Sequence, residues 1–228
     1  MRLPNDSFSY RYPHPAVTTD VVVFTIRDGR LNILLIRRAN PPYQGEWALP
    51  GGFLQIDEDL DACAARELEE ETGISGVYLE QLYTFGSTGR DPRERVISVA
   101  YYALLPQDSL ATPRAASDAS DVGWHAFDDL PQLAFDHAAI IGMAHRRLVA
   151  KLDYSTIAFQ FMPEAFTLSE LQCVYESLLH QALDKRNFRK RILSLDLIEE
   201  TGKLRRTGNH RPAREYRAKH PKRVEIIK

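Results

Sequence analysis

The stretch from Gly52 to Ile74 reads GFLQIDEDLDACAARELEEETGI, and it decides the fold of the chain. Four of its glutamates fall within five positions, and like charges three or four residues apart on a helix repel each other. At about 100° per residue, Glu67, Glu70 and Glu71 project to one side of a helix, whereas Glu69 points away. A bound divalent cation is the most economical reason for this cluster, because carboxylates on a rigid helix suit Mg²⁺ or Mn²⁺.

A solvated acidic helix face is the alternative explanation of these glutamates, and it would be the better one for an isolated E-x-x-E-E pattern. Here the loop Pro50-Gly51-Gly52 precedes the helix and Gly73 follows it. Gly51 and Gly52 allow a ligand to approach the backbone closely, although tight turns alone would also explain them. Gly73 is a natural residue to end a helix. These surroundings favour the metal site.

The stretch has the spacing G-x5-E-x7-R-E-U-x-E-E-x-G-U, where U is aliphatic, and it resembles the Nudix box at every fixed position. The resemblance implies an α/β/α sandwich that hydrolyses a nucleoside diphosphate linked to another group. In such an enzyme a metal-activated water attacks a diphosphate phosphorus, and we expect Glu67, Glu70 and Glu71, with the carbonyl of Gly52, to hold the metal.

Two further residues of the box are expected to support the reaction. Arg66 lies four residues before Glu70 and can pair with it or with Glu58, which would orient the metal ligands. The general base stays open between Glu70, Glu71 and an acid within residues 106–120.

Charge is distributed unevenly along the 228 residues. The net charge is −2, but residues 1–163 carry 14 Lys and Arg against 22 Asp and Glu, whereas residues 164–228 carry 15 against 9. The first part is therefore at −8 and the last part at +6, which indicates two modules with different partners. We assign residues 1–153, with an arm at 1–15, to the first domain and residues 154–228 to the second.

The compartment is predicted from what the chain lacks. No stretch reaches the roughly 18 apolar residues of a membrane span, and the first residues are polar and proline-rich, unlike a signal peptide. Cys63 and Cys173 lie in predicted helices without metal-ligand spacing, as small core residues do in a reducing compartment. We expect a cytoplasmic protein with no membrane partner.

Residue patterns place the elements of the first domain. Strands are predicted over residues 17–26, 31–37, 77–85, 96–105 and 122–127, and helices from Asp57–Asp59 to Gly73 and over 138–151. Asp28-Gly29 is a hairpin signal between the first two strands. With these elements, the Nudix resemblance implies an α/β fold, an α/β/α sandwich with a mixed sheet.

Three arginines follow the third of the long strands. Arg90, Arg93 and Arg95 would repel the metal site unless an anion lies between them, so we expect them to bind the phosphates of the substrate. Simple surface ion pairs are the alternative. The run Arg90-Asp91-Pro92-Arg93 resembles that of Nudix proteins that handle ADP-ribose, in the branch of NAD-metabolism repressors called NrtR.

The segment Ala134-Phe135-Asp136-His137 is a further candidate for substrate binding, together with Gly51. Phe135 and His137 could stack on a base or hydrogen-bond a ribose, and the same A-F-D-H occurs in the NrtR branch. The alternative is a helix start capped by Asp136 beside a packed phenylalanine.

The last third of the chain has the pattern of a winged helix-turn-helix. A short strand is possible within 159–166, and Thr167 with Glu170 has the capping-box spacing that begins a helix. A basic helix over 185–193 and two strands over 197–206 and 213–218 follow. The residues expected to contact double-stranded DNA are Lys185, Arg186, Asn187, Arg189, Lys190, Arg205, Arg206 and Arg211. A solvated basic helix or an acidic protein partner is the alternative.

This segment also resembles the C-terminal domain of NrtR proteins, so the resemblance covers nearly the whole chain in the same domain order. It implies an ADP-ribose-sensing, DNA-binding regulator of NAD or sugar metabolism that acts as a homodimer. The filled box leaves open that the protein also hydrolyses ADP-ribose to AMP and ribose 5-phosphate. The alternative is a dedicated Mg²⁺-dependent pyrophosphatase of ADP-ribose or another nucleoside diphosphate sugar, whose basic domain is no regulator.

Overall fold

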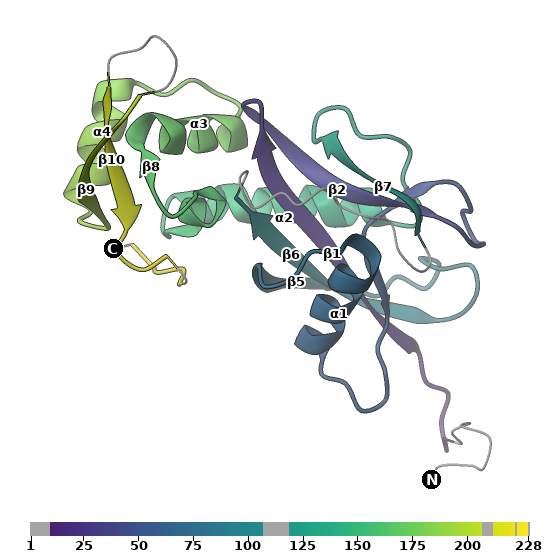
Figure 1. Cartoon of the computed structure of the whole chain (residues 1–228). Helices are drawn as coiled ribbons and strands as arrows, with labels where there is room; N and C mark the ends of the chain where they lie inside the picture. The colour runs from purple at the N-terminus through teal and green to yellow at the C-terminus, as the bar shows by residue number, and fades with distance from the viewer. Residues whose placement is uncertain (1–9, 107–118, 207–211, 222, 228) are drawn as a thin grey trace.

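The computed structural model describes residues 10–106, 119–206, 212–221 and 223–227 (Figure 1). Among these residues, the first part of the chain forms seven strands and two helices. They are β1 (Ala16–Arg27), β2 (Arg30–Arg38), β3 (Trp47–Ala48), β4 (Gly51–Phe53), α1 (Leu60–Thr72), β5 (Tyr78–Phe85), β6 (Val96–Leu105), β7 (Ala119–Ala126) and α2 (His137–Leu152). The predicted order of elements is confirmed.

The seven strands form one mixed sheet. Its main path runs β3-β2-β1-β6-β5, with β4 paired to β1 and β7 paired to β2. The central pair β1 and β6 is parallel, whereas the other pairs of the sheet are antiparallel. The predicted hairpin between β1 and β2 turns at Asp28 and Gly29, which both have positive φ as a two-residue turn requires.

Alternation along β1 explains why helices cover both faces of the sheet. Val21 and Val23 pack in one apolar cluster with Ala64 and Leu68 of α1. Val22, which lies between them, belongs with Phe24 to a second cluster, which contains the apolar side of α2. Because successive side chains of a strand point to opposite faces, one buried strand supports α1 on one side and α2 on the other (Figure 1). This is the expected α/β/α sandwich.

The start of α1 differs from the prediction. The helix begins at Leu60, with Asp59 as N-cap but without a capping hydrogen bond from its side chain. Asp57 and Glu58 therefore lie in the preceding turn rather than in the first helical turn. Gly73 adopts the left-handed conformation after the helix and donates its N–H to the carbonyl of Glu69, as expected of a helix end.

The last part of the chain forms the predicted winged helix-turn-helix. Its elements are η2 (Ile157–Phe161), β8 (Phe166–Thr167), α3 (Leu168–Leu179), α4 (Lys185–Ser194), β9 (Ile198–Arg205) and β10 (Ala213–Ala218). The order of its small sheet is β8-β10-β9. Thr167 caps α3, and the capping box with Glu170 is complete in both directions.

The expected strand within residues 159–166 is wrong for most of its length. Residues Ile157–Phe161 form a short 3₁₀ helix, and of the run only Phe166 pairs in a strand, opposite Tyr216. A short, continuously apolar run has no period of its own, so burial decides its conformation. Here Ile157, Phe159 and Phe161 are all buried.

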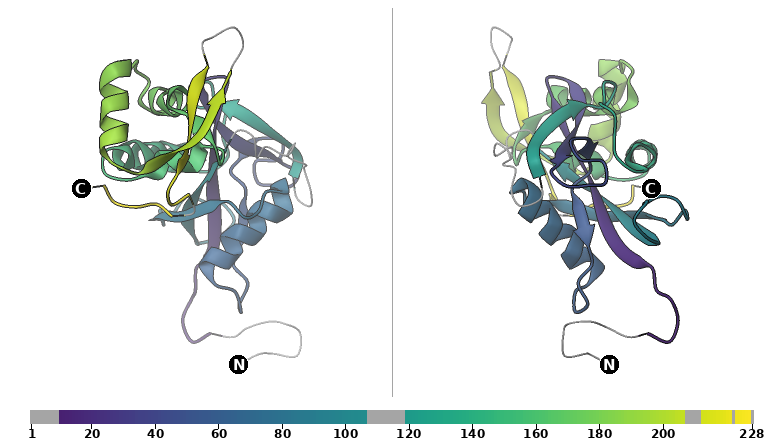
Figure 2. Two further views of the ribbon diagram at one scale, coloured as in Figure 1. Left: turned by 60° about the vertical axis from the view of Figure 1, so that its left-hand side comes forward. Right: turned by 90° about the vertical axis from the view of Figure 1, so that its right-hand side faces the viewer.

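The two parts of the chain share one apolar core. Ile140 and Leu148 of α2 belong to the same buried cluster as Leu171 and Leu178 of α3. In both views of Figure 2 the winged segment, green to yellow, lies at the end of the molecule opposite the N-terminus. The core is thus continuous across the boundary assigned between residues 153 and 154. No described helix has the length and apolar character to cross a membrane.

Candidate functional site

A cavity of about 460 Å³ opens where β1, β2, β4, α1 and the start of α2 meet. It brings together most of the residues singled out for chemistry or ligand binding. Among its lining residues are Gly51, Gly52, Arg66, Glu67, Glu70, Glu71, Arg90, Arg93, Phe135 and His137. Glu58 and Arg95, which were assigned to the same site, do not line it.

Gly51 and Gly52, the first residues of β4, contact two glutamates of α1. The N–H of Gly51 donates to Oε2 of Glu71 at 2.8 Å, and Glu71 is buried. A Cβ atom on Gly52 would lie 2.4 Å from the carboxyl carbon of Glu67. Only glycine therefore leaves room for the Glu67 carboxylate, and burial raises the pKa of that carboxyl.

Arg66 is the centre of a charge cluster on the solvent side of α1. It makes two hydrogen bonds to Glu58, of 2.7 and 2.9 Å, and one each to Glu67 at 2.7 Å and Glu70 at 3.0 Å. The sequence predicted that Arg66 pairs with Glu58 or with Glu70, and in the structure it pairs with both. The Arg66 hydrogen bonds lower the pKa of Glu58 to about 2, so this carboxylate is charged near neutral pH. Glu58 therefore acts on the cavity through Arg66.

The donor types of this region fit a divalent cation. Carboxylate oxygens of Glu67, Glu70 and Glu71 line the cavity beside the Gly52 backbone, and hard oxygen donors are those that Mg²⁺ and Mn²⁺ prefer. The close approach of the Glu67 carboxylate to the Gly52 backbone, which a Cβ atom would prevent, agrees with such a site. Within the described part of the chain, however, no three His, Cys, Asp or Glu side chains are grouped as metal ligands. Arg66 holds Glu67 and Glu70 in this conformation.

Arg90 lies in a buried network of charges rather than on an open loop. Its Nε and Nη2 donate to the two carboxylate oxygens of Asp136 at 3.1 and 2.7 Å, and Nη2 also donates to Asp20 at 3.2 Å. Ser98 donates to the same Asp20 oxygen. Burial acts to lower the pKa of Arg90, but its carboxylate partners outweigh burial and raise it, so the group stays charged.

His137 and Asp136 have roles that the sequence did not predict. His137 is buried, and its Nδ1 accepts a hydrogen bond from the N–H of Leu49 at 2.9 Å. Its Nε2 lies 3.5 Å from Asp20, which suits a neutral ring with its proton on Nε2, and burial lowers the pKa of His137. The side chain of Asp136 does not cap α2, because it pairs with Arg90 instead.

An aromatic and cationic rim borders the cavity. The guanidinium of Arg93 lies 5.3 Å from the ring centre of Phe53 and 6.0 Å from that of Phe135, and it pairs with Asp91 at 2.8 Å. Arg93 remains partly exposed, with 41% of its side-chain surface open to solvent. Arg95 instead donates to the carbonyl of Ser87, away from the cavity. The expected phosphate-binding role thus has geometric support for Arg93 but not for Arg95.

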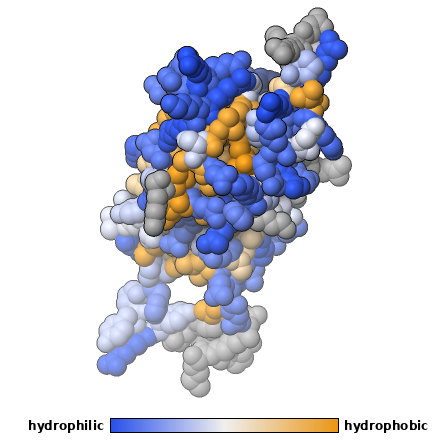
Figure 3. All heavy atoms as spheres, turned by 90° about the vertical axis from the view of Figure 1, so that its left-hand side faces the viewer, coloured by the Kyte–Doolittle hydropathy of each residue, from blue (hydrophilic) through white to orange (hydrophobic). Residues whose placement is uncertain are grey.

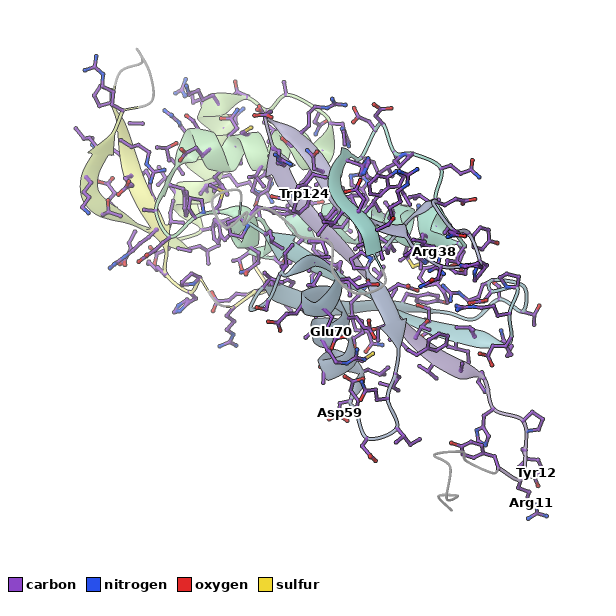
Figure 4. All side chains as sticks on the ribbon, turned by 45° about the vertical axis from the view of Figure 1, so that its right-hand side comes forward. Arg11, Tyr12, Arg38, Asp59, Glu70 and Trp124 are labelled. Atoms are coloured by element: carbon purple, nitrogen blue, oxygen red, sulfur yellow. The ribbon has the colours of Figure 1, made fainter. Side chains whose placement is uncertain are left out.

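Three cavity residues were missed by sequence reasoning. Arg38 is the last residue of β2, and its guanidinium lies 4.9 Å from the ring centre of Phe135. Arg38 and Glu70 of α1 are labelled in Figure 4. Thr18 is buried, and its hydroxyl has no hydrogen-bond partner in the described structure. Asp20 had a detectable signal, because one acid inside a buried run of β-branched residues needs partners.

The winged segment presents a basic face. Lys185, Arg186, Asn187 and Lys190 of α4 are exposed, whereas Arg189 is half-buried, with Nη2 3.4 Å from the hydroxyl of Ser169. The face of the molecule shown in Figure 3 carries hydrophilic side chains around a band of apolar ones. The exposed cations are placed where an anionic partner could reach them.

The two adjacent arginines at the end of β9, Arg205 and Arg206, differ from each other. Arg205 donates to Glu215 at 3.0 Å, to the carbonyl of Ala165 at 2.8 Å and to Glu170 at 3.3 Å. It therefore joins β9 to β10 and to the start of α3 rather than facing a partner with its full guanidinium. Arg206 is exposed, and Arg211 lies outside the described residues.

Comparison with known proteins agrees with both parts of the chain. Residues 15–144 match the family model of the NUDIX domain, and residues 158–218 match that of the NrtR DNA-binding winged helix domain. The "ADPR responsive transcriptional repressor NtrR" of Acinetobacter baylyi is 40% identical over 210 residues, which cover 90% of this chain and 83% of that protein. An "ADP-ribose pyrophosphatase" of Methanocaldococcus jannaschii is 39% identical over 60% of this chain and 77% of its own length.

Solved structures are similar to the whole chain and to its NUDIX domain alone. Shewanella oneidensis NrtR in complex with a 27mer DNA has a TM-score of 0.80 and 39% identity, covering 90% of this chain and 94% of that one. The NUDIX domain of the same protein complexed with ADP ribose has a TM-score of 0.55 and 38% identity, covering 60% of this chain and 90% of that one.

Proposed function

The chain belongs to the Nudix family, with the winged-helix domain of NrtR regulators, and we propose that it is a transcriptional repressor that ADP-ribose releases from DNA. The Acinetobacter relative is named an ADPR responsive transcriptional repressor, and Shewanella oneidensis NrtR has been solved with a 27mer DNA and, as its NUDIX domain, with ADP ribose. The proposal transfers both ligands to the residues of this chain.

The DNA contact is assigned to the exposed face of α4. Lys185, Arg186 and Lys190 can pair with phosphates, and Asn187 can hydrogen-bond to a base edge in the major groove. Arg206 extends the contact along the wing. Arg205 is excluded from this set, because its donors are used by Glu215, Glu170 and Ala165.

The ADP-ribose contact is assigned to the cavity at α1. A diphosphate carries negative charge, and Arg90 and Arg93 are cations that line the cavity together with the α1 carboxylates. Phe135, flanked by Arg38 and Arg93, offers a ring face for the adenine. The unpartnered hydroxyl of Thr18 suits a polar group of the ligand.

One observation carries the proposal. A single chain combines a cavity lined by arginine, carboxylate and aromatic groups with a second part whose basic helix is exposed, and the two share one core. A dedicated enzyme has no use for the exposed α4 face. A DNA-binding protein without a ligand has no use for the cavity.

The test measures both ligands on one preparation of the full chain. Fluorescence anisotropy gives the Kd for a duplex from upstream of the protein's own gene, with and without ADP-ribose, and a shuffled duplex of equal length serves as a control. We expect ADP-ribose to weaken binding to the upstream duplex. Equal affinity for both duplexes, or no response to ADP-ribose, contradicts the proposal.

A matched pair of variants separates the α4 contact from a general effect of charge. Arg186→Ala removes an exposed cation of α4, whereas Arg146→Ala removes an exposed cation of α2. We expect the first to weaken DNA binding clearly and the second to leave it unchanged. Equal effects would assign the binding to net charge alone.

Hydrolysis of ADP-ribose is a second candidate function, favoured by the position of Glu67, Glu70 and Glu71 on one cavity wall. These residues would hold Mg²⁺, which lowers the pKa of a bound water and neutralises phosphate charge. Arg66 fixes the orientation of Glu67 and Glu70 through hydrogen bonds. The partly exposed Glu70 is then a candidate to accept a proton from the attacking water, whereas Glu71 is bound to Gly51.

The hydrolase assignment is tested by the release of AMP from ADP-ribose, measured by chromatography with Mg²⁺ and with EDTA. Release that depends on Mg²⁺ supports turnover in addition to sensing. If wild-type protein releases no AMP, the box serves ligand binding alone, and the regulatory proposal is unaffected. We further propose that the repressor is a cytoplasmic homodimer, since two-fold proteins match two DNA half-sites.

A further inference from the structure

Asp136, the residue just before α2, binds an arginine that lines the cavity. Its two carboxylate oxygens accept from Nε and Nη2 of Arg90, and 24% of its side-chain surface is exposed, against 4% for Arg90. Arg90 lines the cavity in which the anionic ligand is placed. Among the described residues, Asp136 and Asp20 use the Nε and Nη2 donors, so a phosphate that binds this guanidinium through two nitrogens must compete with one of these carboxylates.

Helix α2 connects this pair to the winged segment. Its N-cap is Asp136, and its 16 residues span roughly 24 Å at 1.5 Å per residue. Farther along the helix, Ile140, Ala144 and Leu148 are fully buried in the core that also contains Leu171 and Leu178 of α3. A packed core of this kind moves as a unit, so a shift at the start of α2 is carried to α3.

Helix α3 contacts the DNA-binding elements directly. Phe188 of α4 packs on Tyr175 of α3, with ring centres 5.2 Å apart. His145 of α2 lies 3.3 Å from the carbonyl of Leu178, at the far end of α3. One continuous set of contacts therefore runs from Asp136 through α2 and α3 to α4.

We propose that Asp136 is the positioning residue that couples ADP-ribose binding to DNA release, because it competes with the diphosphate for Arg90. This inference rests on the function proposed above. Arg90 is charged in both states, and an incoming phosphate adds a third anion to a guanidinium that already holds two carboxylates. Asp136 is the more exposed of the two, with 24% of its side-chain surface open against 10% for Asp20, so water can solvate it when it leaves Arg90. Its departure releases the start of α2 from the sheet side of the cavity.

The competition supplies what a ligand-driven change requires. A ligand shifts an equilibrium only by the difference in its affinity for the two states. Here the diphosphate binds better where Arg90 is free of Asp136, and α4 is placed for DNA where Arg90 and Asp136 are paired. By reciprocity, DNA must weaken the binding of ADP-ribose by the same factor.

The test uses Asp136→Asn, which removes the charge but keeps a residue that can cap a helix. Asp129→Asn, at an exposed position on the loop before α2, is the matched control. The Kd for the upstream duplex is measured with and without saturating ADP-ribose, and calorimetry gives the Kd for ADP-ribose. Chromatography afterwards shows that the ADP-ribose is intact.

We expect ADP-ribose to raise the DNA Kd of wild type and Asp129→Asn about 5-fold or more. For Asp136→Asn we expect a change within about 2-fold, together with unchanged DNA binding in the absence of ligand and ADP-ribose affinity retained within about 3-fold, ratios small against the range of couplings seen in proteins. If Asp136 had only a structural role, its replacement would not change the ratio of the DNA Kd with ADP-ribose to that without it while the affinities for DNA alone and for ADP-ribose alone stay the same.

Two results overturn the inference. One is a response of Asp136→Asn equal to that of wild type, and the other is loss of ADP-ribose binding, which would place Asp136 in the ligand site itself. A wild type that does not respond to ADP-ribose instead overturns the function proposed above. If Asp136→Asn does not fold, Asp136→Ser, which also caps helices without charge, is judged by the same ratio.

Discussion

The imidazole of His137 accepts a hydrogen bond from the backbone N–H of Leu49 at 2.9 Å, which joins the first residue of α2 to the segment between β3 and β4 that leads into the acidic box. On its other side the ring lies 3.5 Å from Asp20, which also binds Arg90 and Ser98. A single neutral ring thus holds together three segments that line the cavity.

This geometry makes the free energy of unfolding depend on pH. Burial lowers the pKa of His137 in the folded protein below the value of about 6.5 of the unfolded chain. The unfolded state therefore binds the proton more tightly, so the stabilisation is complete above pH ~6.5 and is lost as the pH falls below it, by up to about 1.4 kcal/mol per pH unit. Urea unfolding at several pH values between 7.5 and 5 measures this slope.

His137→Gln is the control for that slope. Glutamine can accept from the N–H of Leu49 but does not titrate, so the loss of stability toward low pH should be shallower by up to one proton. His125 and His145, whose pKa values burial also lowers, remain in both proteins and cancel in the comparison. Identical slopes would place the pH dependence on those two residues.

The adjacent glycines of the box should fail in different ways. A Cβ on Gly51 would lie 2.1 Å from the carbonyl oxygen of Thr19, a backbone atom, whereas one on Gly52 would meet the side chain of Glu67. We expect Gly51→Ala to lower the free energy of unfolding by about 1–3 kcal/mol, as overpacking does. Gly52→Ala should displace Glu67 and weaken metal-dependent AMP release roughly 10–100-fold, with a smaller effect on stability.

Thermal unfolding and AMP release on the two variants check this contrast. Equal losses of stability in both would mean that the Glu67 side chain cannot move aside.

Glu70→Gln should separate chemistry from folding. The side chain of Glu70 is 54% exposed and forms an ion pair with Arg66, so the variant should melt at nearly the wild-type temperature. If Glu70 accepts the proton from water, AMP release falls roughly 100-fold or more. ADP-ribose binding by calorimetry should persist. A variant that retains full turnover excludes Glu70 and leaves Glu71 or an acid within residues 106–120 as the base.

The two arginines at the end of β9 should differ in DNA binding. Arg206→Ala removes an exposed cation, so the slope of log K against log salt should fall by about 0.9 if it contacts one phosphate. Arg205→Ala breaks the bonds to Glu215 and Glu170 and should instead lower the free energy of unfolding by roughly 1 kcal/mol. That corresponds to a Tm lower by about 2–4 °C.

Salt titrations of DNA binding and melting curves on both variants give the answer. If Arg205→Ala instead lowers the slope of log K against log salt by about 0.9 and leaves the Tm unchanged, Arg205 contacts a DNA phosphate.

The shared core predicts that both parts of the chain unfold together. Leu171 of α3 is fully buried, and Leu171→Ala should destabilise the protein by about 2–5 kcal/mol. The two tryptophans, Trp47 and Trp124, both lie in the sheet part, so their fluorescence reports that part alone. We expect the urea midpoint of this fluorescence to fall together with that of circular dichroism.

Leu193→Ala, at a position of α4 that is 49% exposed, is the control and should leave both midpoints in place. Tryptophan fluorescence that keeps its wild-type midpoint in Leu171→Ala would show two independent units.

The sequence by itself determined the features that depend on local spacing. The periodicity of apolar residues predicted the strands, the helices and the order of elements in the winged helix-turn-helix, because this periodicity depends only on residues close in sequence. The capping box of Thr167 and Glu170 and the turn at Asp28-Gly29 were likewise predictable, since both need only contacts between near neighbours. The box spacing placed Arg66 within reach of Glu58 and Glu70.

Only the tertiary structure decided which partner each charged side chain takes. Arg90, Arg93, Arg95 and Arg205 look alike in the sequence, yet one is buried between two aspartates, one stays at the cavity rim and two bind to neighbouring segments. A buried charge must find its counter-charge wherever folding brings one, and Asp20 is 70 residues from Arg90. The continuous core between α2 and α3 was hidden for the same reason, because contacts between distant segments follow from packing rather than from the local pattern.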